Sequence, residues 1–151
     1  MSHLKQQLQD SMKEAMRSKD AQRLSVIRLL ISAIKQREID ERIELDDAQV
    51  LAILDKQLKQ RKDSIQQFHS ANREDLVIKE TFEMDVIQEF MPKPLLEEEI
   101  SSMIDHVIKS TDAASIKDMG KVMAALKPEI QGRADIATVS AQIKSKLSEI
   151  N

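Results

Sequence analysis

The sequence lacks cysteine, tryptophan and tyrosine, and its 151 residues include only two glycines and three prolines. The absence of cysteine excludes disulfides and thiolate catalysis. A protein built only from strands needs a turn signal roughly every ten residues, and so few glycines and prolines cannot supply them. No apolar run is long enough to span a membrane, and Met1–Gln6 lacks the apolar segment of a secretory signal. We therefore expect a cytoplasmic protein without a membrane partner.

Residues that favour helices make up most of the chain. Hydrophobic residues account for 41% and charged residues for 32%, which is enough apolar material for a core. Alanine, leucine, methionine, glutamate, lysine and glutamine all favour helix. The net charge of −3 excludes a uniformly basic nucleic-acid binder but leaves room for a local basic face. The composition therefore predicts an all-α fold.

The first part of the chain contains four amphipathic stretches. Their apolar spacing predicts helices over residues 4–15, 21–37, 46–70 and 72–90. Asp20 and Asp46 are candidate N-caps, because their carboxylates can accept hydrogen bonds from unpaired backbone N–H groups. Ile39–Leu45 has no helical stripe and is expected to form a loop. Arg28 and Lys35 lie together outside the apolar stripe of the second helix.

A proline pair predicts the division of the chain. Each proline disfavours helix in the residue before it, so Pro92 and Pro94 together indicate a stiff, extended connector. The sequence thus predicts two domains, 1–92 and 93–151. We expect a four-helix N-terminal lobe and a three-helix C-terminal lobe.

The predicted C-terminal lobe has clear helix starts and stops. Glu97–Glu99 begin its first helix, where carboxylates complement the helix dipole. Ser115–Asp118 resembles a capping box that starts the next helix. Pro128 is expected to end that helix or to open a further short turn. Gly132 can adopt the left-handed conformation, and Asp135 can cap the last helix.

Common catalytic motifs are missing. The sequence contains neither a nucleophile elbow nor a glycine-rich phosphate loop. His3, His69 and His106 are isolated, and no His and carboxylate spacing typical of a metal site surrounds them. We therefore expect no catalytic residue, no metal ion and no cofactor.

One helix face near the C-terminus combines small and cationic residues. At 100° per residue, Lys117, Gly120, Lys121 and Ala124 lie opposite an apolar stripe. A glycine within a helix costs about 1 kcal/mol relative to alanine, so it needs an explanation. Either a phosphate backbone approaches this face closely, or another helix of the same lobe packs against Gly120.

Three further cations extend the candidate RNA-binding surface. They are Lys127, Arg133 and Lys144. From Ser115 onward basic residues outnumber acidic ones. This mild excess favours phosphate contacts.

Several spaced clusters near the C-terminus form one signature, namely Lys117–Met123, Leu126–Pro128, Gly132–Asp135 and Val139–Ser140. Upstream stretches add to it, namely Arg23–Leu30 with Ala33–Lys35, Lys59–Ile65 with Phe68, and Met91–Leu95 followed by Glu97–Ile100. Together these stretches resemble the YqeY family, and the C-terminal signature also occurs in the tail domain of GatB, one of the proteins that make up the tRNA-dependent amidotransferases. Pro94 and Leu96 depart from the polar residues expected there, and Leu96 removes a side chain that would cap the following helix.

The resemblance implies a two-lobe all-α fold with a three-helix C-terminal lobe. In GatB the tail contacts the body of tRNA, whereas a separate domain, which has no counterpart here, phosphorylates and amidates the misacylated tRNA. The resemblance therefore implies RNA contact rather than ligase activity by this chain alone.

The sequence thus favours a non-catalytic accessory protein that binds tRNA or another structured RNA. One alternative is a component of a glutamine-dependent tRNA amidotransferase, a carbon–nitrogen ligase in which a partner supplies every catalytic group. The other is a protein–protein adaptor. The sequence predicts neither the identity of the partner nor the oligomeric state.

Overall fold

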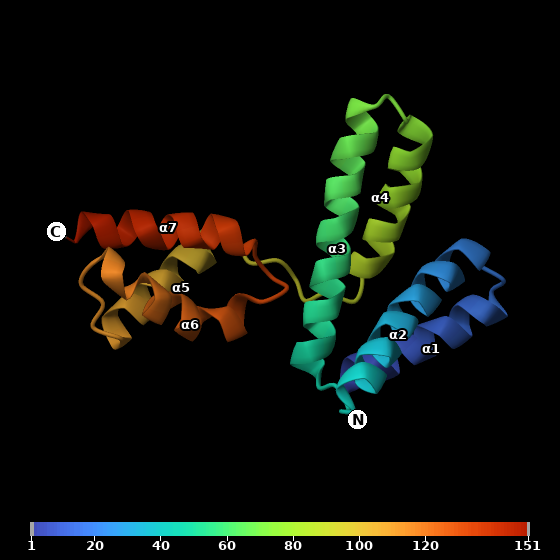
Figure 1. Ribbon diagram of the computed structural model, residues 1–151, viewed down its shortest axis with the longest axis horizontal. Helices are drawn as coiled ribbons and strands as arrows, with labels where there is room; N and C mark the ends of the chain where they lie inside the picture. Colours follow the sequence, from blue (N-terminus) through green and yellow to red (C-terminus); the bar gives the residue numbers. More distant parts are fainter. Residues whose placement is uncertain (1, 151) are drawn as a thin grey trace. The chain divides into compact units, whose positions relative to one another are not determined.

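The computed structural model describes residues 2–150, which form seven α-helices and one 3₁₀ turn and contain no strand (Figure 1). The elements are α1 (His3–Arg17), α2 (Ala21–Glu41), α3 (Asp47–Ser70), α4 (Glu74–Gln88), α5 (Glu97–Ser110), η1 (Ile116–Asp118), α6 (Met119–Ile130) and α7 (Ile136–Glu149). This confirms the all-α fold class. None of the helices within residues 2–150 is both long and apolar enough to cross a bilayer.

Backbone contacts divide the chain into two compact units, one up to Met91 and one from Pro92 onward. The first unit contains α1–α4 and the second contains α5–α7. Each unit is described by itself below. That residues 1–92 and 93–151 are separate domains stays a prediction.

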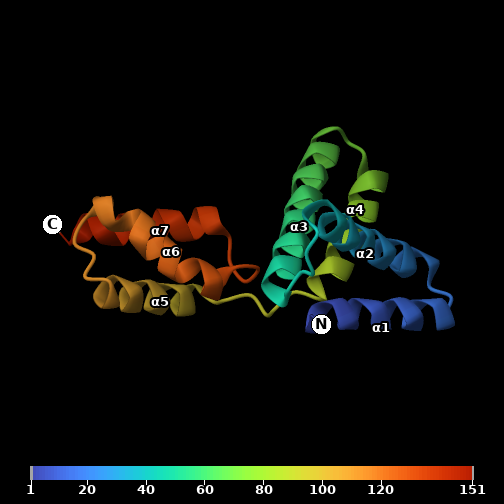
Figure 2. The ribbon, with the colours of Figure 1, turned by 60° about the horizontal axis from the view of Figure 1, so that its bottom comes forward.

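The N-terminal unit consists of two antiparallel helix pairs. Helix α1 packs against α2, and α3 packs against α4 along most of their length (Figures 1 and 2). Helix α2 also contacts α3 and α4, while α1 contacts α3. Helices α2 and α3 thus each contact the other three helices of this unit, and the several neighbours of α2 agree with its wide apolar stripe.

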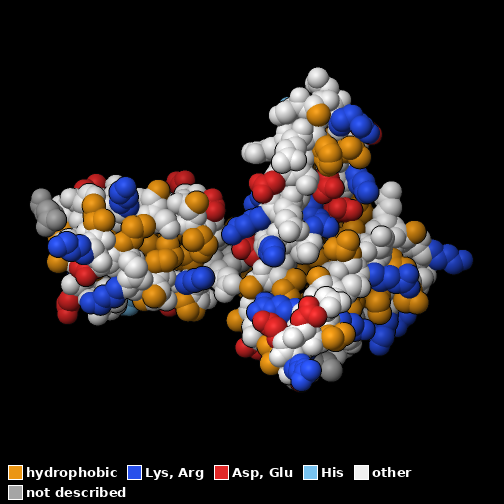
Figure 3. Space-filling view, viewed as in Figure 1, with side chains coloured by type: hydrophobic (Ala, Val, Ile, Leu, Met, Phe, Trp, Pro, Cys, Tyr) orange, Lys and Arg blue, Asp and Glu red, His pale blue; other side chains and the backbone are white. Residues whose placement is uncertain are grey.

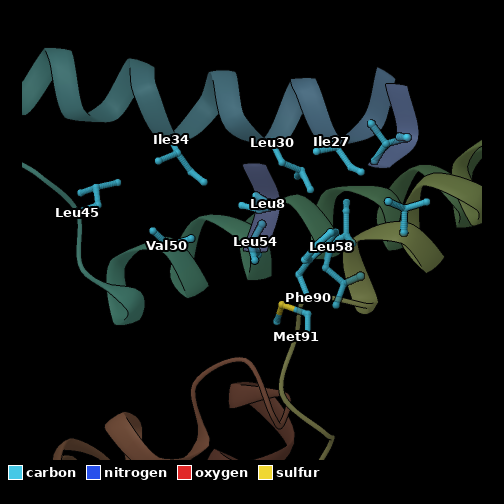
Figure 4. Packing of buried hydrophobic residues seen from close by; sticks show 14 residues of the cluster. Leu8, Ile27, Leu30, Ile34, Leu45, Val50, Leu54, Leu58, Phe90 and Met91 are labelled. Atoms are coloured by element: carbon cyan, nitrogen blue, oxygen red, sulfur yellow. The ribbon is translucent and has the colours of Figure 1, made fainter. Parts of the chain in front are cut away.

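The core of the N-terminal unit lies between α2 and its neighbours. Ile27, Leu30 and Ile34 of α2 are buried and point toward Leu8 of α1 and Leu54 of α3 (Figure 4). Full burial of such a side chain contributes about 1.5–3 kcal/mol. These contacts fix how the two pairs pack.

Side-chain caps begin α2 and α3 as predicted. Oδ1 of Asp20 accepts a hydrogen bond of 3.2 Å from the backbone N–H of Arg23. Asp46 and Gln49 form a reciprocal capping box, in which each side chain accepts from the other residue's backbone N–H at 2.9–3.0 Å. Both predicted N-caps are confirmed.

The predicted loop at Ile39–Leu45 is wrong in its first three residues, because α2 continues to Glu41. Arg37 pairs with Glu41 across one helical turn at 2.8 Å, which supports the extra turn. Arg42 then adopts the left-handed conformation with φ 55° and ends the helix. The prediction failed because this turn is held by charge pairs rather than by an apolar stripe.

The predicted start of the fourth helix is also wrong, by two residues. Asn72 adopts the left-handed conformation with φ 59° between α3 and α4, and α4 begins only at Glu74. Arg73 is the residue at the N-cap, and its side chain forms no cap hydrogen bond. Glu74 and Asp75 supply acidic residues in the first turn instead, where they complement the helix dipole.

The C-terminal unit is a three-helix arrangement around its own core. The fully buried residues include Ile104 of α5, Leu126 of α6 and Ile143 of α7. Gly132 adopts the predicted left-handed conformation with φ 76°, and Asp135 caps α7 by accepting from the N–H of Ala137 at 3.2 Å. The local stops and starts that frame α7 are therefore confirmed.

Pro128 does not end α6, which continues to Ile130. Proline removes one hydrogen bond to the carbonyl four residues earlier. Pro128 and Ala124 are both exposed, so water can hydrate the carbonyl that the proline leaves unpaired. Buried Ile130 anchors the last turn in the core.

Candidate nucleic-acid interface

A capping box before α6 positions the first candidate lysine. Oδ2 of Asp118 accepts hydrogen bonds from the backbone N–H groups of Ala114 at 2.8 Å and Ser115 at 3.3 Å. These hydrogen bonds lower the pKa of Asp118 from its ordinary value of 3.8, and the nearby Lys121 lowers it further. The segment folds as the 3₁₀ turn η1 rather than as the first turn of α6. Lys117 is exposed on this turn.

The exposed side of α6 carries short, uncharged side chains between its lysines. Val122, Leu126 and Ile130 are buried in the core. The opposite face carries exposed Gly120, Lys121, Ala124, Ala125 and Pro128. Because glycine, alanine and proline have short side chains, this face lets a large ligand approach the helix backbone.

Gly120 lies in open space. Apart from the two chain neighbours and the backbone of α6 itself, a Cβ atom at this position would meet no described atom within 4 Å. No helix of the C-terminal unit therefore packs against Gly120, which excludes the close-packing explanation. Gly120 also lies in the first turn of α6 rather than within the helix, so its cost to helix stability is smaller than expected.

The lysines of this face form no direct ion pair, although Asp118 lies near Lys121. Among residues 2–150, no ion pair forms at Lys117, Lys121 or Lys127. Lys127 is exposed and lies seven residues after Gly120, two helical turns along one side of α6. We call Lys117, Gly120, Lys121, Ala124 and Lys127 the α6 strip.

Arg133 forms hydrogen bonds within the C-terminal unit. Its Nε donates to the carbonyl of Lys93 at 3.0 Å, and its own carbonyl accepts from the N–H of Leu95 at 2.9 Å. These two hydrogen bonds fasten the connector at Lys93–Leu95 to the segment before α7. Arg133 therefore positions the backbone, and its Nε is not available to a ligand while this contact persists.

Lys144 lies on a different helix from the α6 strip. It is exposed on α7, and its backbone carbonyl accepts from Oγ of Ser148 at 2.8 Å. Of the six predicted residues, the structure brings Lys117, Gly120, Lys121 and Lys127 onto η1 and α6. Figure 3 shows that Lys and Arg side chains border an apolar stretch on one side of the C-terminal unit.

No described group of three or more His, Asp and Glu side chains is placed to hold a metal ion. His69 pairs with Glu74 at 2.9 Å at the exposed end of the α3–α4 pair. The interface thus offers cations and small residues, which suit binding to a polyanion.

The fold and this surface define an all-helical protein with a cationic, low-lying face on its C-terminal unit. Comparison with known families identifies the wider group. Residues 5–147 match the family described as Yqey-like protein. The chain belongs to this family, and the predicted resemblance to the YqeY family is confirmed.

Curated relatives come from several yeasts and share one name, "Altered inheritance of mitochondria protein 41, mitochondrial". The Saccharomyces cerevisiae protein is 33% identical over 144 residues, which cover 95% of this chain and 76% of the relative. The Lachancea thermotolerans protein is 32% identical over 143 residues, covering 90% and 76%. The Eremothecium gossypii protein is 40% identical over 120 residues, covering 76% and 63%.

The predicted cytoplasmic location is wrong by this comparison, because these relatives are named as mitochondrial proteins. The prediction relied on the absence of an apolar secretory signal at the N-terminus. That criterion addresses secretion, and it does not separate the cytoplasm from other compartments.

Proposed function

We propose that the chain binds folded RNA, such as tRNA, through the α6 strip and acts without catalysing a reaction itself. The observation that carries the proposal is the open position of Gly120 beside two unpaired lysines. Packing inside the unit does not account for this glycine, whereas the close approach of a sugar-phosphate backbone does.

The chemistry of the α6 strip suits a phosphate backbone. Lysine ammonium groups attract phosphates, and neutralised phosphates release their counterions into solution. Ala124 leaves the surface between the cations low, so the backbone is not held away from the helix. Backbone contacts of this kind position an RNA without reading its sequence.

The scarcity of aromatic residues favours structured RNA over single strands. Proteins that bind single-stranded RNA commonly stack bases on aromatic side chains, and the chain has three phenylalanines and no tryptophan or tyrosine. Phe90 is buried, and Phe68 and Phe82 are half-buried. Double-helical RNA is recognised mainly by shape and by backbone contacts, for which cations suffice.

The resemblance to the tail of GatB supports the same function. The α6 strip falls within the signature that resembles the tail of GatB, and that tail contacts tRNA. The catalytic domain of GatB has no counterpart in residues 1–151, so the resemblance supports binding rather than ligase activity.

The test is to replace Lys117 and Lys121 together by glutamine and to titrate the full chain with tRNA over a range of salt concentrations. Loss of two phosphate contacts should reduce the magnitude of the slope of log affinity against log salt by roughly 1.4–1.8. It should also weaken binding tenfold or more near 0.1 M salt. Helicity should not change, because both side chains are exposed.

A matched control removes the same charge from the same unit. Lys93 and Lys109 are exposed and form no ion pair among the described residues, so K93Q/K109Q should bind tRNA like the unmodified chain. Equal affinities for both double variants would remove the α6 strip from the proposal. Partner binding that is insensitive to salt would instead favour the protein-adaptor alternative.

A further inference from the structure

The charges of the α1–α2 pair are strongly segregated along the sequence. Residues 1–37 contain eight Lys and Arg but three Asp and Glu, whereas residues 38–47 contain six Asp and Glu but one Arg. Lys and Arg side chains gather over the α1–α2 pair, and Asp and Glu side chains gather where α2 passes to α3 (Figure 3). The chain's net charge of −3 conceals this local excess of positive charge.

Carboxylates of the acidic segment, residues 38–47, form hydrogen bonds within the N-terminal unit. Oε2 of Glu38 accepts from Nζ of Lys5 at 2.8 Å and from the N–H of Leu45 at 2.9 Å. Asp47 accepts from the Ser2 hydroxyl and from the N–H of Leu4. These hydrogen bonds lower the pKa of Glu38, chiefly through Lys5, and that of Asp47, chiefly through Ser2. Asp47 therefore holds α1 against the start of α3, and Glu38 joins Lys5 of α1 and Leu45 to the end of α2. Glu38 also lies near Lys35, which lowers the pKa of Glu38 further, but neither carboxylate forms an ion pair with Lys13, Lys19 or Arg28.

Several cations of the basic segment, residues 1–37, form no ion pair among the described residues. Within the described part of the chain, Lys13, Lys19, Arg28 and Lys35 form no ion pair, and all four are exposed. By contrast, Arg23 on the same helix as Arg28 pairs with Glu89. We call these four unpaired residues the hairpin basic surface.

Helix geometry brings these cations together. Arg28 and Lys35 are seven residues apart on α2, which is about two turns along one face. Lys35 lines a small groove with Lys5 and Gln9 of α1, so this face of α2 borders α1. Lys13 follows Gln9 by one turn.

Lys19 closes the surface at the tip of the pair. It lies in the turn between α1 and α2 and adopts a left-handed conformation with φ 58°. Its position completes a run of positive charge from the tip of the pair along the border between the two helices.

We infer that the hairpin basic surface is a second phosphate-binding surface, which contacts the backbone of a folded RNA. This inference rests on the proposed function and extends it from the C-terminal unit to the N-terminal unit. Four exposed, unpaired cations concentrate positive potential. The outer face of α1 near Lys13 is largely polar, with Gln6, Asp10 and Arg17 exposed, although Met16 and, on α2, Leu29 are exposed as well. This largely polar surface favours a hydrated polyanion over an apolar partner helix or a bilayer interior.

The test compares two triple variants of the full chain by tRNA titration at several salt concentrations. K13Q/K19Q/K35Q should weaken binding tenfold or more near 0.1 M salt. It should also reduce the magnitude of the slope of log affinity against log salt by roughly 2.1–2.7. The control K56Q/K62Q/K79Q removes the same charge from exposed lysines of the same unit and should bind within about twofold of the unmodified chain. K13R/K19R/K35R keeps the charge and should restore binding.

The outcomes separate this inference from the proposed function. If K13Q/K19Q/K35Q binds like its control while K117Q/K121Q loses affinity, the inference fails and the α6 strip stands. If K13Q/K19Q/K35Q loses affinity and K117Q/K121Q does not, the inference stands and the α6 strip fails. If neither variant loses affinity, both fail. If the hairpin variant loses binding only to vesicles containing phosphatidylserine, the surface serves a membrane and the inference is overturned.

Discussion

At the scale of single residues, the surroundings of Gly120 distinguish between two explanations for this glycine, helix packing and ligand binding. Sequence spacing places it among lysines but leaves both explanations open. In the structure no other described part of the chain comes within 4 Å of the Cβ position, a property that no local pattern in the sequence encodes. The physical reason is that free space depends on how α5 and α7 pack, and this is decided far from Gly120 in sequence.

Replacing Gly120 by alanine should keep or raise the stability of the C-terminal unit by up to several tenths of a kcal/mol, because alanine is the better helix former. Gly120→Gln should also fold, since its side chain can extend into solvent, but it should obstruct the RNA backbone and weaken binding. Thermal unfolding and tRNA titration of both variants test this. Unfolding of the unit by either substitution would show that the glycine is structural.

Arg133 shows where residue-scale prediction stops. The assignment of Arg133 to the RNA surface by charge and spacing stays a prediction, but the sequence did not predict that its Nε contacts the carbonyl of Lys93, 40 residues away in sequence. By contrast, the caps at Asp20, Asp46 and Asp135 are confirmed, because each acts on a backbone N–H within three residues. Local contacts could be predicted, and the long-range one could not.

At the scale of elements, α3 and α4 are joined by a half-buried ion pair. Nε of Arg61 lies 3.5 Å from Oε2 of Glu83, and their side chains are only 11% and 20% exposed. This Nε is buried and has no hydrogen-bond partner among the described residues. The guanidinium therefore depends on Glu83 for charge compensation.

Glu83→Gln should lower the free energy of unfolding by about 1–2 kcal/mol, because it leaves the Arg61 charge poorly compensated in a half-buried position. Denaturant unfolding measures the change. The control is Asp55→Asn, which breaks a more exposed pair with Lys59 on the same helix as Arg61 and should cost at most about 0.5 kcal/mol. A loss for Glu83→Gln no larger than that of the control would contradict the importance of the pair.

Element boundaries could be predicted only where an apolar stripe or a cap marks them. The extra turn of α2 at Ile39–Glu41 is held by side-chain pairs such as Arg37–Glu41, so the stripe ends before the helix does. The end of α6 was predicted wrongly at Pro128 for a different reason. Pro128 faces solvent, and an exposed proline disturbs a helix less than one that breaks a buried hydrogen bond.

At the scale of the whole molecule, composition alone predicted the all-α class, because helix formers dominate and turn residues are scarce. The net charge of −3 is less informative than the distribution of charge. Unpaired cations gather at two surfaces, the α6 strip and the hairpin basic surface, and both are solvent-exposed. The central claim is that these surfaces bind the phosphate backbone of folded RNA.

The most direct measurement is the salt dependence of tRNA binding by the unmodified full chain. Two contacts from Lys117 and Lys121 and three or four from the hairpin basic surface predict a slope of roughly −3.5 to −5.5 in the plot of log affinity against log salt. The chain should also prefer tRNA to an unstructured single strand of equal length. A slope near zero, or no measurable binding at low salt, would contradict the account.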